Sequence, residues 1–96
     1  MKVILSDKAR GDLLRIDKYL ADRNEAAADA LAAKFNASFS NLARFPFLGR
    51  PRIGLGAGVR CLVVGRHLVF YVVDQDRLTI IRVIDGRMDV EEEFKR

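Results

Sequence analysis

The sequence has few of the residues on which metal sites, disulfides and membrane spans depend. It contains one cysteine, one histidine, two prolines and no tryptophan in 96 residues. A single cysteine excludes an intramolecular disulfide, and with only one histidine beside it a zinc site is not expected. The longest apolar run, Leu68 to Val73, spans six residues, whereas a membrane helix needs about 20. We therefore expect no metal, no cofactor and no membrane partner.

The remaining composition is that of a small globular protein. Half of the residues are apolar, and a chain of this length fits one compact domain over residues 1–96. The opening run Val3–Leu5 is too short for the apolar core of a secretory signal, which takes about 7–15 residues. We expect a cytoplasmic protein.

Acidic residues are missing from the middle of the chain. No Asp or Glu lies between Asp29 and Asp74, and this span of 44 residues carries six Lys or Arg residues. The whole chain has a net charge of +4, so the rest of the sequence carries a net −2. A basic middle predicts an anionic partner, either a nucleic acid or an acidic protein segment.

The first half of the chain has the periodicity of two helices. Apolar residues recur at helical spacing over about 7–21, with Ser6 as the N-cap, and over about 25–44, with Asn24 as the N-cap. The connection between them is short, which favours an antiparallel helical hairpin over about 7–44. The two stripes consist of Ala9, Leu13, Ile16 and Leu20, and of Ala28, Leu31, Phe35, Phe39 and Leu42.

The second half predicts a basic loop followed by strands. Residues 45–58 are rich in Pro, Gly and Arg, which end the second helix. Three β-prone runs then fill 59–84 and are separated by the two-residue turns 65–66 and 75–76, as in a three-stranded meander. The segment 85–96 adds a short helix near its end. The fold class is α+β, in the order β-α-α-β-β-β, with the helical hairpin on one face of an antiparallel sheet.

Two-residue turns fix the register and sort the side chains between the two faces of the sheet. The predicted pairs are Arg60 with Tyr71, Tyr71 with Ile80, and Val69 with Arg82. The face expected to pack on the helices carries Val59, Cys61, Val63, Leu68, Phe70, Val72, Thr79, Ile81 and Val83. The face expected to be open carries Arg60, Leu62, Val64, His67, Val69, Tyr71, Ile80, Arg82 and Ile84.

The predicted open face forms a candidate binding surface. On it, Arg60 and Arg82 lie diagonally across the central strand, within reach of one anion. Arginine and tyrosine on an apolar floor favour binding of a peptide or a nucleic-acid backbone. The candidate partner-binding residues are Arg50, Arg52, Arg60, Leu62, Arg66, Tyr71, Arg82 and Arg87.

Short motifs along nearly the whole chain resemble the RelE/ParE superfamily of type II toxin–antitoxin toxins, with the ParE branch closest. The matching segments are Leu5-Ser6-x-x-Ala9, Asp12-Leu13, Ala28–Leu31, Phe45-Pro46-x-Leu48-Gly49-Arg50-Pro51, Gly58–Arg60, Gly65–Tyr71 and Ile81–Arg87. The resemblance implies a toxin that inhibits DNA gyrase by binding, without chemistry of its own. It also implies a hetero-oligomer with a cognate ParD-like antitoxin, whose acidic C-terminal segment would complement the acid-free middle.

Two alternatives stay open at this stage. The first is a RelE-like, ribosome-dependent mRNA endonuclease, for which Arg60, Arg82 and His67 are the catalytic candidates. Arginine is a poor general base because it stays protonated, so His67 would have to take that role. The second is a non-toxic relative that retains only antitoxin binding.

Overall fold

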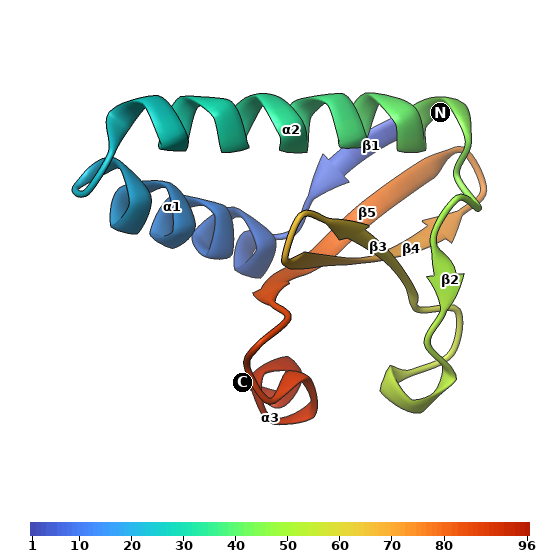
Figure 1. Ribbon diagram of the computed structural model, residues 1–96. Coiled ribbons are helices and arrows are strands. Elements are labelled where there is room, and N and C mark those ends of the chain that lie inside the picture. The colour runs from blue at the N-terminus through green and yellow to red at the C-terminus, as the bar shows by residue number, and fades with distance from the viewer.

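The computed structural model describes residues 1–96 as three α-helices, five strands and one turn of 3-10 helix (Figure 1). Figure 1 shows the hairpin of the two long helices on one side of the sheet and the short C-terminal helix on the other. The elements are β1 Lys2–Leu5, α1 Asp7–Ala21, α2 Glu25–Arg44, β2 Arg50–Pro51, η1 Ile53–Leu55, β3 Arg60–Val64, β4 His67–Asp74, β5 Arg77–Asp85 and α3 Val90–Lys95.

Both long helices begin at the predicted caps. The Ser6 hydroxyl accepts a hydrogen bond from the Ala9 amide at 3.1 Å, and the Asn24 side chain accepts one from Ala27 at 3.0 Å. Each cap satisfies one of the amides that lack a partner in the first turn of a helix. The predicted helical hairpin is thereby confirmed. None of the helices is long and apolar enough to cross a membrane.

The five strands form one sheet in the order β1-β5-β4-β3-β2. The predicted meander of β3, β4 and β5 is confirmed, and β2 adds a short antiparallel pair to β3. The opening strand β1 pairs with β5 in parallel, so the sheet is mixed rather than wholly antiparallel. The short C-terminal helix is also present.

The register of β5 departs from the prediction at one residue. Arg60 faces Tyr71 and Tyr71 faces Ile80, as predicted. Val69, however, faces Val83 rather than Arg82, because a bulge lets Phe70 pair with Arg82 and leaves residue 81 without a partner. A bulge moves every later side chain of its strand to the opposite face. The prediction that Arg82 shares a face with Ile80 is therefore wrong.

The assignment of the two faces is also wrong for β3, β4 and β5 up to the bulge, where the faces are exchanged; beyond the bulge Val83 and Ile84 lie on their predicted faces. The face that packs under α1 and α2 is the one predicted to be open, and its buried core consists of Ala9, Phe35, Leu42, Val64, Val69, Tyr71, Leu78, Ile80 and Val83. The other face holds Val59, Cys61, Phe70 and Ile84, and it is covered by Leu55 of η1 and by Val90 and Phe94 at α3. Val63, predicted to be inside, is exposed.

Where β1 ends, side chains at the start of α1 form hydrogen bonds with the backbone of β5. The last pair between these strands joins Leu5 to Ile80. Beyond it, the Ser6 hydroxyl donates to the carbonyl of Ile81 at 3.0 Å, and the Val83 amide donates to the Asp12 carboxylate at 2.9 Å. Two polar side chains thus satisfy backbone groups that an edge strand would otherwise leave unpaired.

Candidate functional site

An apolar groove runs between α1 and α2. Its volume is about 340 Å³, and ten of its thirteen lining residues are apolar. Leu14 of α1 is 66% exposed beside it, and Arg10, Asp17 and Asn36 supply the polar part of its lining. Small side chains on α2 let the two helices lie close together. Larger apolar side chains of both helices form the walls of the groove: Leu13, Ile16, Leu20, Leu31, Phe35 and Phe39.

The apolar stripe of α2 contributes both to the core and to this groove. Phe35 is buried, but Leu31 and Phe39 are half-buried and also line the groove. In the sequence, Leu14 was the signal of this groove. It lies next to the predicted stripe of α1 and widens the apolar surface of that helix beyond what a contact between two helices needs. Apolar surface of this kind is typical of a docking site for a partner segment.

A second exposed apolar surface lies in the loop between α2 and β2. Phe45, Phe47 and Leu48 are all more than half exposed, and Phe47 is 64% exposed. The guanidinium of Arg60 lies 5.2 Å from the ring centre of Phe47 and donates to the Phe47 carbonyl at 3.2 Å. Aromatic residues beside arginine are the composition of interface hot spots. We call residues 45–48 the Phe47 loop.

The Phe47 loop is fixed to the sheet through Gly49. The Gly49 amide donates to the Tyr71 hydroxyl at 2.8 Å, and Arg60 Nε donates to the Gly49 carbonyl at 2.9 Å. A Cβ at Gly49 would lie 2.7 Å from that hydroxyl, so only glycine fits. Arg60 and Tyr71 therefore support the loop from below. Tyr71 is fully buried, and its predicted exposure on a binding face is wrong; Leu62 is half-buried against the main core.

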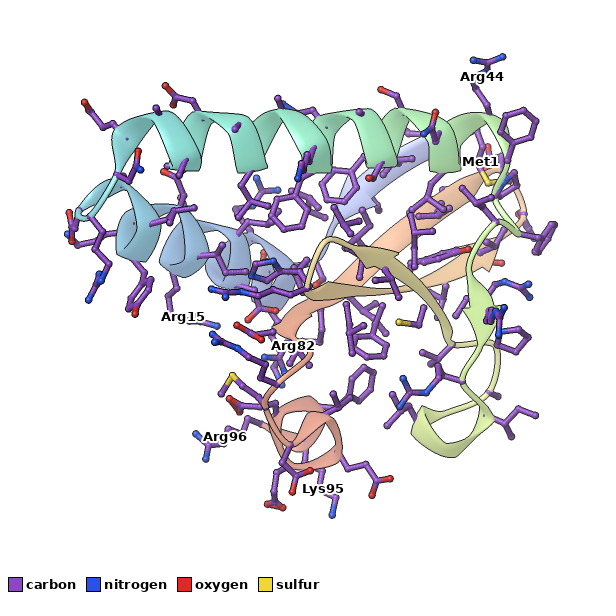
Figure 2. All side chains as sticks on the ribbon, viewed as in Figure 1. Met1, Arg15, Arg44, Arg82, Lys95 and Arg96 are labelled. Carbon is purple, nitrogen blue, oxygen red and sulfur yellow. The ribbon has the colours of Figure 1, made fainter.

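Arg82 is part of a buried ion pair and not of an open surface. Its Nε and Nη2 donate to the Asp12 carboxylate at 2.8 and 3.1 Å, and Nη1 donates to the carbonyl of Glu93. The hydrogen bonds to Asp12 raise the pKa of Arg82. Figure 2 shows Arg15, Arg82 and Arg96 gathered between α1 and α3. Arg82 thus joins α1, β5 and α3, and the sequence analysis did not identify Asp12 as its partner.

His67 lies on the face of the sheet under the helices. Its ring is 5.6 Å from that of Phe35, in an edge-to-face arrangement, and its Nδ1 has no hydrogen-bond partner. Burial lowers the pKa of His67, Asp85 opposes that shift, and Arg66 and Arg87 add to it. The imidazole is therefore neutral at pH 7.

The three residues proposed for a nuclease are not brought together. Arg60 supports the Phe47 loop, Arg82 is bound to Asp12, and His67 packs against Phe35. Arg60 and Arg82 point to opposite faces of the sheet, since Arg60 pairs with Tyr71 and Arg82 with Phe70. The predicted shared anion site of Arg60 and Arg82 is wrong.

The other predicted arginines fall into two places. Arg50 is exposed in β2 near the Phe47 loop, and Arg52 lies 5.5 Å from the ring centre of Phe70. Arg66 and Arg87 are exposed at the other end of the meander, where both contact Asp85. No group of three or more His, Cys, Asp or Glu side chains is placed to hold a metal ion.

A family model described as "ParE toxin of type II toxin-antitoxin system, parDE" matches residues 3–90. Toxin ParE3 of Caulobacter vibrioides is 32% identical over 90 residues, which cover 93% of this chain and 90% of that protein. Toxin ParE1 of the same species is 39% identical over 87 residues, which cover 88% of each chain.

Two solved structures share the fold. A chain of the chromosomal ParDE TA system from P. aeruginosa superposes with a TM-score of 0.75 at 19% identity, covering 88% of this chain and 95% of that one. A YoeB/ParE toxin from Agrobacterium tumefaciens gives 0.67 at 22% identity, covering 88% and 98%. Both have the arrangement of helices and sheet described above.

Proposed function

The chain belongs to the ParE toxin family of type II toxin–antitoxin systems, and from this premise we propose that it inhibits DNA gyrase by binding and that a cognate antitoxin neutralises it. Membership of the ParE branch of the RelE/ParE superfamily is the resemblance that the sequence motifs indicated. Gyrase is the target that this membership implies, which would place its action in the cytoplasm.

The apolar groove between α1 and α2 is the observation that supports the antitoxin half of this proposal. A groove of about 340 Å³ with apolar walls accommodates the apolar side chains of an amphipathic segment. The segment of the chain between residues 30 and 73 has no acidic residue. An antitoxin segment with both apolar and acidic residues would match the groove and this basic surface together.

The Phe47 loop supports the gyrase half. Its aromatic side chains are exposed, and the Gly49 backbone, Tyr71 and Arg60 hold the loop in one position. A preorganised loop loses little conformational freedom on binding, which favours affinity. Arg50 follows the loop directly and remains exposed. We assign the Phe47 loop to the target and the α1–α2 groove to the antitoxin.

Two surface variants separate these assignments. We expect Leu14→Glu to weaken binding of the ParD-like antitoxin encoded beside the toxin by at least tenfold, or about 1.4 kcal/mol, because it places a charge at the groove. We expect Phe47→Ala to weaken gyrase inhibition by a similar factor and to leave antitoxin affinity unchanged. Both side chains are mostly exposed, so neither change removes core packing.

The assays are titration calorimetry with the antitoxin and gyrase supercoiling with purified toxin. Unchanged antitoxin affinity in Leu14→Glu would remove the groove from the proposal. Loss of both activities in both variants would show that one surface serves both partners. Cleavage of mRNA on translating ribosomes, with normal gyrase activity, would favour the endonuclease alternative.

A further inference from the structure

A basic pocket lies where the turn between β3 and β4 meets the two long helices. Its volume is about 510 Å³, within the range of about 300–1,000 Å³ that is typical of small-molecule sites. Cationic side chains come to it from four elements of the chain: Arg15 from α1, Lys34 from α2, Arg66 from the turn and Arg87 from the segment after β5. We call it the Arg66 pocket.

The charges of the Arg66 pocket are unbalanced. Four cationic side chains line it, and Asp85 is its only acidic residue. The hydrogen bonds from Arg87 lower the pKa of Asp85 to about 2, so its carboxylate is ionised at neutral pH. With His67 neutral, the lining carries a net charge of +3, or +2 when Asp12, the ion-pair partner of Arg15, is included. Such an excess in one concave site attracts an anion.

Asp85 also holds two arginines in place. Arg87 donates through Nε and Nη2 to the two carboxylate oxygens, at 3.2 and 3.0 Å, and Arg66 Nε lies 3.6 Å from the same carboxylate. The remaining guanidinium nitrogens of both arginines form no hydrogen bond within the protein, and neither does the ammonium group of Lys34. These donors line one pocket and are free to bind a ligand.

The rest of the lining is apolar or aromatic. Ile16, Leu20 and Leu31 line the pocket, and the ring of Tyr19 is mostly exposed beside them. His67 also lines it, is 7% exposed, and has an Nδ1 without a partner. His67 therefore lies beside the pocket, where its imidazole can report on what binds there.

We propose that the Arg66 pocket binds a small organic phosphate such as a mononucleotide. Arg66, Arg87 and Lys34 would hold the phosphate, and the apolar lining would receive the organic part. A phosphate dianion can use three separate cationic groups, whereas a carboxylate is satisfied by one bidentate arginine. This site is distinct from the Phe47 loop but shares Ile16, Leu20 and Leu31 with the α1–α2 groove, and its existence does not depend on gyrase being the target.

His67 provides the readout, because it is the only histidine of the chain. Its imidazole proton signals in a one-dimensional NMR spectrum therefore need no assignment. We expect AMP to shift these signals with saturation, and to bind at least tenfold more tightly than inorganic phosphate because only AMP uses the apolar lining. We expect Arg66→Gln with Arg87→Gln to weaken AMP binding at least tenfold.

The matched control removes a positive charge elsewhere. Arg44 is exposed at the end of α2 and lies over Phe45, so Arg44→Gln should leave AMP binding unchanged. Lys34→Gln, an exposed substitution that cannot disturb the core, should weaken AMP binding and keeps the proposal testable if the double variant unfolds. The absence of a saturable shift, or equal AMP affinity in Lys34→Gln, would overturn the proposal. Binding of an oligonucleotide without binding of AMP would overturn it too, in favour of a nucleic-acid surface.

Discussion

The buried ion pair of Asp12 and Arg82 allows us to predict how much a substitution at Asp12 lowers the free energy of unfolding. Asp12 is 3% exposed, and its carboxylate accepts hydrogen bonds from two nitrogens of Arg82 and from the Val83 amide, with Arg15 as a further partner. Asp12→Ala removes all of these acceptors at once. It leaves the charge of the Arg82 guanidinium, whose side chain is 11% exposed, uncompensated by the carboxylate that binds it, with Glu93 as the remaining nearby acid.

The expected loss follows from that uncompensated charge. Breaking a buried ion pair by removing one partner costs about 3–5 kcal/mol, and a domain of this size is stable by about 5–15 kcal/mol. Asp12→Ala should therefore remove a large part of the free energy of unfolding. Replacing both partners, as Asp12→Leu with Arg82→Met, should cost less than Asp12→Ala alone, because no buried charge then remains unpaired.

Urea denaturation followed by circular dichroism measures both changes. Asp17→Ala is the matched control, since Asp17 is exposed on the same helix and exposed substitutions usually stay within about 0.5 kcal/mol. A loss below about 1 kcal/mol in Asp12→Ala would refute the reasoning. So would a double variant that is less stable than the single one.

Two further predictions concern the loop support and the acid range. Gly49→Ala should lower the free energy of unfolding by about 1–3 kcal/mol, because the new Cβ would lie 2.7 Å from the Tyr71 hydroxyl and 2.8 Å from the Cys61 carbonyl. As the control, Gly54→Ala should have a far smaller effect, because a Cβ there meets nothing within 4 Å. Denaturation curves of the two variants compare them directly. Asp85 has a pKa of about 2 in the folded chain against an ordinary value of 3.8, so its contribution to stability is present above pH 4 and is lost as the pH falls to about 2. Asp85→Asn should flatten the fall in stability across that range, and an unchanged acid transition would contradict this.

The helical half of the fold was predictable because its signals are local. Ser6 and Asn24 cap helices whose apolar residues recur at helical spacing. Both helices have the bounds that this pattern predicted. The turn at Gly65 was predictable for the same reason. Its φ of 60° is one that glycine adopts without steric cost, and the register of β3 on β4 followed from it.

The two faces of the sheet could not be told apart by alternation, because both are apolar. One packs under the helical hairpin, and Leu55, Val90 and Phe94 cover the other. The alternation of residues along a strand reveals which residues share a face of the sheet. It does not reveal which face the long helices cover when other segments of the chain cover the opposite face. The bulge at residue 81 has no strong local signal either, since Ile81 and Arg82 read as ordinary alternation.

The candidate site was affected by both errors. Arg60, Tyr71 and Arg82 were predicted to face a partner. Arg60 and Tyr71 instead support the Phe47 loop, and Arg82 pairs with Asp12. Arg50, Arg66 and Arg87 are exposed, and their binding roles stay predictions. The groove beside Leu14 depends on how α1 and α2 pack against each other, which the sequence of either helix alone does not determine.

The most direct measurement pairs two assays on one preparation of folded toxin. The first follows supercoiling and the trapping of cleaved DNA by purified gyrase, and the second follows mRNA on translating ribosomes. We predict trapped gyrase and intact mRNA, with gyrase inhibition abolished when the cognate antitoxin is added in equal amount. Cleaved mRNA with normal gyrase activity would contradict it, and so would a folded toxin that affects neither.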